Sequence, residues 1–292
     1  MPDKLDWPAG FRLLSAIPPD VNETTPVLVA VHGISRNAQE IRDTFRDAAR
    51  GRLVILAPEF DRQVFSSYQR LGLASRGLRA DLMLEAALER FARATGIATS
   101  RFHLFGYSGG AQFAHRFAMM YPGALRSLHL AAAGWYTFAD PRAPWPRGIG
   151  RSLEGRRVAR TIGRALKLPI TVYVGGGDRQ RDPALRQDER IDRQQGRDRV
   201  ERARNWVRHV SALRPAGSEP VELRILGRAG HSFLECCAPE AGNLAQMVVD
   251  GVLDSDGAAT SGRLRRARRL ALRDMPSQRK PAPQARTQPQ PG

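Results

Sequence analysis

A serine lies between glycines where an apolar run gives way to a helical pattern. The stretch G-Y-S-G-G occupies residues 106–110, directly after the run that begins at Phe102. So sharp a corner strains the backbone, and glycine neighbours give it room. The usual reason for such strain is to expose a hydroxyl that attacks an acyl carbon. Ser108 is therefore the candidate nucleophile.

A nucleophilic serine needs a base and an acid that orients the base. Asp178 ends the stretch ITVYVGGGD, after an apolar run and three glycines, and His231 lies in ILGRAGHSF after the last strand-like run. The order serine, aspartate, histidine along the chain is the order of α/β-hydrolase catalytic residues. Asp178 is the preferred acid, Asp182 the reserve and Asp140 a distant third.

Backbone N–H groups must also stabilise the oxyanion that forms on the attacked carbonyl. The run VLVAVHGISRN ends a strand at His32 and Gly33. We expect the N–H groups of Ile34 and Gly109 to form the oxyanion hole, and His32 to be a loop residue that bonds the backbone. His231 would take the Ser108 proton, and water would release the resulting acyl-enzyme.

These residues need a sheet that brings the ends of distant strands together. Apolar runs alternate with helical patterns, which predicts an α/β fold with a mostly parallel sheet covered by helices on both faces. The predicted strands are Val27–His32, Leu53–Ala57, Phe102–Tyr107, Ser127–Ala133, Ile170–Val174 and Val221–Ile225, with Phe11–Ile17 as an antiparallel edge. The predicted helices are Asn37–Arg50, Gly77–Ala94, Gly109–Tyr121, Val200–Leu213 and Pro239–Leu253.

Two segments interrupt this rhythm. Residues 134–168 are rich in proline, tryptophan and arginine, and they follow a sheet strand, so they are a candidate cap over the site. Residues 258–292 are rich in arginine, proline and glutamine, which is typical of a disordered tail. The predicted organisation is a hydrolase domain over residues 1–257 followed by this tail.

The formal charge of +17 is concentrated in a few segments. Residues 142–167 carry net +7, residues 179–208 net +4 and residues 261–292 net +8. All but three of the 46 basic residues are arginine, which indicates a compositional bias and weighs against nucleic-acid binding. The arginines of residues 142–164 could attract anionic substrates, but we favour a solvated surface. Contact of the tail with nucleic acid or an anionic surface is likewise the less favoured alternative.

The remaining composition excludes several classes of protein. No apolar run approaches the length of a membrane span, and residues 1–10 lack the apolar segment of a signal peptide, so we expect a cytoplasmic location. Cys236 and Cys237 are adjacent, a spacing that disfavours a disulfide between them. Two reduced structural thiols are expected, and a metal site built on them with His231 is the weaker alternative.

The run from Val27 to Leu253 resembles the α/β-hydrolase superfamily. The motifs that carry the resemblance are VAVHGISRNAQEIRDTF, LVILAPEF, GIATSRFHLFGYSGGAQFAHRFAMMYP, LAAAGWYTFADP, VYVGGGD and QQGRDRVERARNW. More narrowly, the chain is similar to bacterial esterases related to polyhydroxybutyrate depolymerases and feruloyl esterases. The resemblance implies Ser108, His231 and Asp178 as catalytic residues and no metal or organic cofactor. The basic tail lies outside the family pattern.

Three functions fit this reading. The first is a serine hydrolase that cleaves carboxylic esters or thioesters of a small acyl substrate; the second uses the same triad as an acyltransferase or amidase; the third is a non-catalytic binding protein. A serine at position 108 argues against a dehalogenase, which would require a carboxylate there, and against a dienelactone hydrolase, which usually has a cysteine.

Trp135 and Tyr136 could line an acyl pocket or merely pack a loop onto the core. Arg199 or Arg202 could point toward the cleft or simply begin a helix. Acyl length and oligomeric state stay open.

Overall fold

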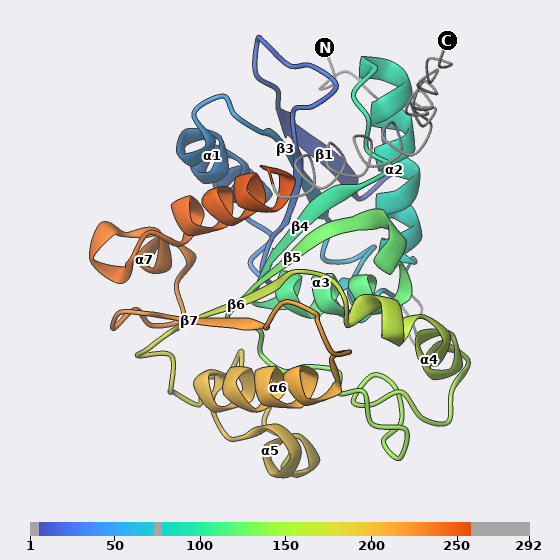
Figure 1. Cartoon of the computed structure of the whole chain (residues 1–292), viewed down its shortest axis with the longest axis vertical. Coiled ribbons are helices and arrows are strands. Elements are labelled where there is room, and N and C mark those ends of the chain that lie inside the picture. The colour runs from blue at the N-terminus through green and yellow to red at the C-terminus, as the bar shows by residue number, and fades with distance from the viewer. Residues whose placement is uncertain (1–5, 73–77, 258–292) are drawn as a thin grey trace, which may run out of the picture. The chain divides into compact units, whose positions relative to one another are not determined.

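A seven-stranded sheet runs through the chain (Figure 1), in the order β1-β3-β2-β4-β5-β6-β7. The computed structural model describes residues 6–72 and 78–257. The strands are β1 (Phe11–Ala16), β2 (Val27–Val31), β3 (Val54–Phe60), β4 (Phe102–Tyr107), β5 (Leu125–Ala131), β6 (Ile170–Gly175) and β7 (Glu222–Leu226). β1 pairs antiparallel with β3, and every other pairing is parallel. The predicted α/β architecture, including the antiparallel edge strand, is confirmed.

Helices cover both faces of this sheet, as expected for buried parallel strands. They are α1 (Ala38–Ala49), α2 (Ala80–Thr95), α3 (Gly109–Met120), α4 (Leu153–Ala165), α5 (Glu189–Gln195), α6 (Arg199–Leu213) and α7 (Phe233–Cys237), with a further helix over residues 244–257. Figure 1 shows α1 and the helix at 244–257 on one side, and α2, α3 and α4 on the other.

Alternation along β2 shows how one strand serves two cores. Val29 and Val31 join the core cluster that contains Phe113 of α3. Leu28 joins the opposite cluster, which contains Phe45 of α1. Successive side chains of a strand point to opposite faces, so a strand buried on both faces must be apolar throughout.

Three helices escape the sequence pattern, each for a physical reason. The α4 helix buries only Gly155, Val158 and Ala165 and is otherwise rich in arginine, so its apolar stripe is weak. The α5 and α7 helices have seven and five residues, too few for a periodic signal. The predicted helix Pro239–Leu253 is interrupted at Gly242, where φ is 99°.

The candidate cap, residues 134–168, contains α4, which the sequence pattern does not predict. The α4 helix packs against α3, and Val158 lies in the same core cluster as Phe113. Whether the segment covers the site stays a prediction. The predicted tail, residues 258–292, lies outside the described residues, and the division of domains at residue 257 stays a prediction too. Within the described ranges, no helix is long and apolar enough to span a membrane.

A buried polar chain ties the strands to the last helix. Ser127 Oγ lies 2.7 Å from His103 Nδ1 and 2.8 Å from His129 Nε2. His103 Nε2 in turn lies 3.3 Å from a carboxylate oxygen of Asp256. Burial, with a smaller effect of His103, lowers the pKa of His129 to about 3, so His129 is neutral at physiological pH. The network satisfies polar groups that would otherwise be costly inside the core.

Phe45 anchors α1 on the sheet, and its removal should be costly. Its side chain is completely buried, and its ring centroid lies 4.8 Å from that of Phe105 and 6.3 Å from that of Phe233. We expect Phe45→Ala to lower the free energy of unfolding by about 3–5 kcal/mol, because it leaves a cavity between helix and strand. Urea unfolding followed by circular dichroism measures this. Leu82→Ala, at a position 48% exposed, is the control and should change it by less than about 0.5 kcal/mol.

Candidate active site

Three strands deliver the predicted catalytic side chains to one edge of the sheet. Ser108 follows β4, Asp178 lies three residues past the end of β6, and His231 lies in the loop after β7. Because β4, β5, β6 and β7 are adjacent and parallel, their carboxyl ends meet at the same edge. Open α/β sheets place their ligand sites there.

The structure brings Ser108, His231 and Asp178 into one hydrogen-bonded relay. The Oγ of Ser108 lies 3.0 Å from Nε2 of His231, and Nδ1 of His231 lies 2.8 Å from Oδ2 of Asp178. The Asp178 side chain is 1% exposed, whereas the His231 side chain keeps 20% of its surface. With Nδ1–H donated to the carboxylate, Nε2 is free to accept the hydroxyl proton. The ring of Tyr107 stacks on that of His231 at 5.6 Å.

The turn at Ser108 is strained, and glycine makes it possible. Ser108 has φ 53° and ψ −109°, in a region that L residues avoid. A Cβ on Gly106 would lie 2.2 Å from the carbonyl oxygen of Gly110, and a Cβ on Gly110 would lie 2.2 Å from that of Val31. Real Cβ atoms do not approach backbone so closely, so both glycines of the G-x-S-x-G motif are required.

The predicted oxyanion-hole residues also lie side by side. A Cβ placed on Gly109 would be 3.4 Å from the backbone nitrogen of Ile34. In the described part of the chain, neither N–H has an intramolecular acceptor. Both donors are therefore available to an oxygen beside Ser108.

His32 fixes the loop that carries Ile34. Its Nε2 accepts the N–H of Phe60 at 3.1 Å, so its Nδ1–H donates to the carbonyl of Gly33 at 2.8 Å. Burial lowers the pKa of His32 to about 4, which keeps the ring neutral. The hydroxyl of Tyr68 donates to the carbonyl of His32 at 2.8 Å. His32 therefore bonds the backbone, as the sequence predicts.

The two candidate acids have different partners. Asp178 contacts His231, whereas both oxygens of Asp182 bond the guanidinium of Arg199, at 2.6 and 3.2 Å. The same guanidinium donates to Oδ1 of Asp178 at 3.1 Å. The hydrogen bonds from Arg199 hold the pKa of Asp182 down at about 2. Asp182 is thus ionised and paired at neutral pH.

Arg199 is the candidate-site residue that the sequence could not single out. Arg199 lies in the first turn of α6. Its side chain is 1% exposed, and its guanidinium contacts both Asp178 and Asp182. The sequence QGRDRVERA contains both Arg199 and Arg202, and nothing in it indicates which of the two points toward the cleft. An ion pair between segments 21 residues apart has no signature in the sequence of either segment.

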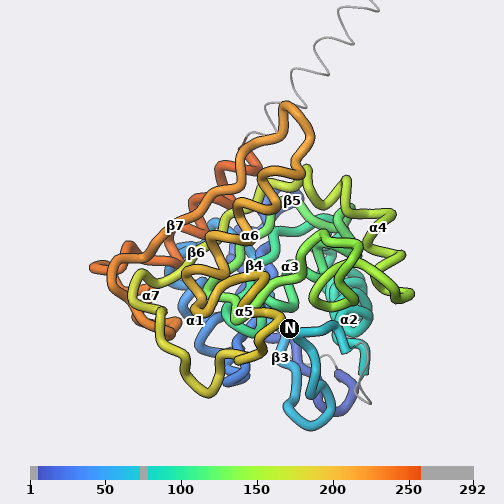
Figure 2. The backbone as a smooth tube through the Cα atoms, turned by 90° about the horizontal axis from the view of Figure 1, so that it is seen from below, coloured from blue at the N-terminus to red at the C-terminus, as the bar shows by residue number. Residues whose placement is uncertain are grey.

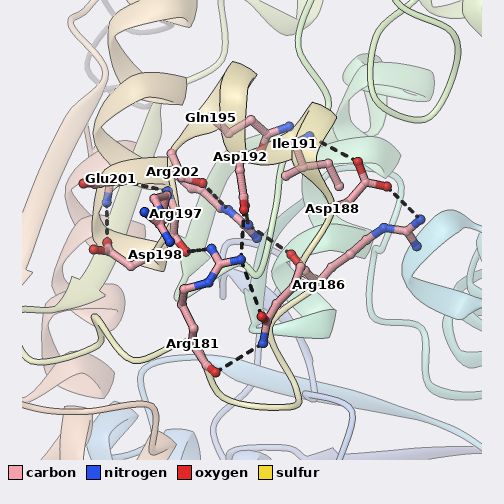
Figure 3. Close-up of polar contacts among 12 residues, drawn as sticks. Arg181, Arg186, Asp188, Ile191, Asp192, Gln195, Arg197, Asp198, Glu201 and Arg202 are labelled. Carbon is pink, nitrogen blue, oxygen red and sulfur yellow. Dashed lines mark hydrogen bonds and ion pairs between the residues drawn. The ribbon is translucent and has the colours of Figure 1, made fainter.

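Arg202, the other candidate, braces the segment between β6 and α6. Its guanidinium donates to Asp192 at 2.7 Å and to the carbonyls of Gly134 and Arg186. Asp192 also pairs with Arg181 at 2.9 Å, so one carboxylate on α5 joins two arginines (Figure 3). Figure 2 shows the yellow stretch before α5 as a wide loop that these contacts must hold. Arg202 therefore has a structural position rather than a place beside Ser108.

A cavity of about 320 Å³ opens beside Ser108 and His231. Its apolar wall includes Ile34, Phe233 and Leu234, and its polar wall includes Glu40. Remaining lining residues are Gly33, Ser35, Asn37, Ile41, Tyr107, Ala184 and Ser232. A mostly apolar pocket with a few polar groups suits a small organic group.

Trp135 and Tyr136 do not belong to the lining of this cavity. Tyr136 is completely buried and stacks on Trp206 at 4.9 Å; its backbone N–H donates to Oε1 of Gln195, and Nε2 of Gln195 donates to its carbonyl. Trp135 is 6% exposed and packs under the guanidinium of Arg116. A substrate-binding role for either residue stays a prediction.

The two cysteines are free thiols beside the histidine loop. Burial raises the pKa of Cys236 to about 12 and that of Cys237 to about 11, which makes them poor nucleophiles and poor metal ligands. Among residues 6–72 and 78–257, no group of three or more histidine, cysteine or acidic side chains could hold a metal ion.

No protein-family model and no curated protein matches the chain. Several solved structures are similar to the chain. Poly(aspartic acid) hydrolase-1 from Sphingomonas sp. KT-1 is 22% identical over 85% of this chain and 96% of its own, with a TM-score of 0.69. LpqC, a poly(3-hydroxybutyrate) depolymerase from Bordetella parapertussis, is 26% identical over 82% and 81%, with a TM-score of 0.65. The protein has the α/β-hydrolase fold, and the resemblance seen in its motifs is confirmed at that level.

The Asp182–Arg199 pair should make the free energy of unfolding depend on pH in the acidic range. Because the folded-state pKa of Asp182 is depressed to about 2, its contribution is complete above pH 4 and is lost as the pH falls toward 2. We expect Asp182→Asn to lower the free energy of unfolding by about 1–2 kcal/mol at pH 7, the 29% exposure of Asp182 reducing the full effect. The difference from wild type should vanish near pH 2 in urea titrations. Asp47→Asn, at an exposed surface pair, should show no such convergence. A penalty that does not change with pH would contradict the assignment.

Proposed function

We propose that this protein is a serine hydrolase that cleaves carboxylic esters or thioesters through an acyl-enzyme. The observation that carries the proposal is the relay from Ser108 through His231 to the buried Asp178, with distances of 3.0 and 2.8 Å. A strained, glycine-fenced serine with a correctly oriented histidine is the arrangement that nucleophilic catalysis requires. The hydrolase names of the similar structures support the general class.

The proposed acylation follows from the geometry. Nε2 of His231 accepts the proton as Oγ of Ser108 bonds to the carbonyl carbon, and the carbonyl π electrons move to oxygen. The N–H groups of Ile34 and Gly109 donate to that oxyanion. The tetrahedral intermediate collapses, the bond to the alcohol or thiol breaks, and His231 returns its proton to the leaving group. Asp178 holds Nδ1–H and stabilises the imidazolium throughout.

Deacylation repeats these steps with water. Nε2 of His231 takes a proton from water as the water oxygen attacks the acyl carbon. The bond from that carbon to Oγ of Ser108 then breaks, and Oγ receives the proton. A carboxylic acid leaves, and the free hydroxyl is restored.

The alternatives differ in acceptor or leaving group. The same relay would serve an amidase or an acyltransferase, and one similar structure is named for a poly(amino acid) and another for a polyester. A non-catalytic binding protein would have no need of an ordered relay on a strained turn. We therefore rank ester hydrolysis first and keep amide cleavage as the alternative that a substrate panel decides.

The decisive experiment labels the purified protein with a fluorophosphonate probe. Wild type should label, and Ser108→Ala should not, because only an activated hydroxyl attacks phosphorus at a useful rate. p-Nitrophenyl esters and matched p-nitroanilides then separate esterase from amidase activity. Ser211→Ala, at an exposed serine on α6, is the control for loss of a hydroxyl outside the relay and should keep labelling. Labelling or ester turnover retained by Ser108→Ala would disprove the proposal.

The two acids give a second test. Asp178→Asn should reduce kcat by about three to four decades, because Asn would favour the wrong tautomer of His231. Asp182→Asn is the matched control: it removes a charge from the same Arg199 but touches no atom of His231. We expect it to cost far less. Steady-state kinetics with a p-nitrophenyl ester measure both. A larger loss in Asp182→Asn would show that the acid is wrongly assigned.

A further inference from the structure

A buried arginine on α3 lacks a counter-ion. Arg116 is 0% exposed, and among the described residues no carboxylate lies within ion-pair distance of it. Its Nε donates to Thr137 Oγ1 at 3.0 Å, and its Nη1 donates to the carbonyls of Gln69 and Gln112. Its Nη2 is buried and has no hydrogen-bond partner. Buried charges are normally paired, and an unpaired buried guanidinium nitrogen is energetically costly.

Two more arginines surround the same place and make the charge imbalance larger. Arg70 is half-buried at the end of η2 (Tyr68–Arg70), and in the described part of the chain its guanidinium has no hydrogen bond or ion pair. Arg186 is exposed, and its acidic contact is Asp188 at 3.5 Å. Burial lowers the pKa of Arg116, and the charges of Arg70 and Arg186 lower it further. The three cations therefore repel one another, and among the described residues their one ion pair is that of Arg186 with Asp188.

The indole ring of Trp135 contacts two of these cations, Arg116 and Arg186. The Cζ of Arg116 lies 4.3 Å from its ring centroid, and the Cζ of Arg186 lies 5.8 Å from it. Stacking on the indole offsets part of the desolvation of a guanidinium. It supplies no acceptor to the free Nη2, however, and it does not cancel the repulsion among three positive charges. An anionic group would do both.

The cluster lies further along α3 from Ser108, outside the lining of the cavity beside it. Arg116 follows Ser108 by eight residues on α3, a rise of about 12 Å. The η2 segment lies along the same helix: the Tyr68 hydroxyl is 2.6 Å from where a Cβ on Gly109 would be, and Gln69 bonds Arg116. Ala184 lines the cavity beside Ser108, and Arg186 lies two residues further along that segment.

We propose that Arg70, Arg116 and Arg186 form a carboxylate subsite, and that the substrate carries a free carboxylate remote from the bond that is cleaved. A carboxylate accepts two parallel N–H bonds from a guanidinium, which matches the planar donor edge of arginine. The reach from Ser108, on the order of 10 Å, suits a carboxylate several bonds from the scissile carbonyl. The proposal rests on the proposed function, because it names the substrate class of the same site.

The test compares anionic substrates with neutral partners of equal length. One series is the mono-p-nitrophenyl esters of linear dicarboxylic acids from glutaric to sebacic acid, each beside its methyl-capped diester. A second series, followed by proton release, is the acetate esters of ω-hydroxy acids beside their methyl esters, which puts the carboxylate on the alcohol side. In at least one series kcat/KM should favour the anionic member by about tenfold or more, the value of one charge-assisted hydrogen bond.

Variants locate the preference. Arg70→Gln and Arg186→Gln alter accessible side chains, and each should reduce the ratio of anionic to neutral kcat/KM by about five- to tenfold, mainly through KM. Arg190→Gln, an exposed arginine on nearby α5, is the matched control for a lost charge and should keep the wild-type ratio. Arg116→Gln tests the buried member. If that variant does not fold, the Arg70 and Arg186 variants still decide the question.

The outcomes separate this inference from the proposed function. Probe labelling and hydrolysis of neutral esters, with no preference for an anionic member in either series, would overturn the carboxylate subsite and leave the hydrolase intact. A preference that survives Arg70→Gln and Arg186→Gln unchanged would overturn the subsite's location. Failure of probe labelling and of every ester would reject the hydrolase, and the subsite with it.

Discussion

The first turn of α3 packs so closely on β2 that no side chain fits between them. A Cβ on Gly110 would lie 2.2 Å from the carbonyl oxygen of Val31, and one on Gly106 would meet Gly110 as closely. This contact fixes where α3 starts and thereby the φ of 53° at Ser108. It also places Gly109 beside the backbone nitrogen of Ile34 and sets the direction of α3, on which Arg116 follows about two turns later. The proposed nucleophile, oxyanion hole and carboxylate subsite all depend on one helix–strand approach that only glycine permits.

Buried arginines are used in two different ways around this site. On α6, Arg199 and Arg202 are almost fully buried; Arg199 pairs with two carboxylates and Arg202 with one, so the energy of removing their charge from water is offset by pairing. Those pairs hold Asp178 and the segment before α5 in place. On α3, Arg116 is equally buried but faces carbonyl oxygens and an indole, with other cations beside it. A buried arginine that is paired with a carboxylate stabilises the fold, as Arg199 and Arg202 do. A buried arginine without such a pair, like Arg116, is a candidate for binding an anion.

The sequence predicts the sheet, its edge strand and the strand ends that carry Ser108, Asp178 and His231, because apolar runs and glycine-rich turns are local signals. It does not predict α4, whose apolar stripe is short, nor the break at Gly242. It also could not choose between Arg199 and Arg202. Pairing between segments is decided by packing, and so is the absence, among residues 6–72 and 78–257, of a carboxylate within ion-pair distance of Arg116.

The two sides of Ser108 differ in chemistry, and this difference bears on selectivity. Toward α1 the described cavity is lined by Ile34, Phe233 and Leu234, with Glu40 as its acidic member. Toward η2 lie three arginines and an indole. A substrate with an apolar group at one end and a carboxylate at the other would match both sides, and a reversed substrate would set its carboxylate against Glu40. With the proposed carboxylate subsite in place, charge asymmetry across the site would orient the substrate as well as attract it, because the repulsive side would disfavour the reversed direction.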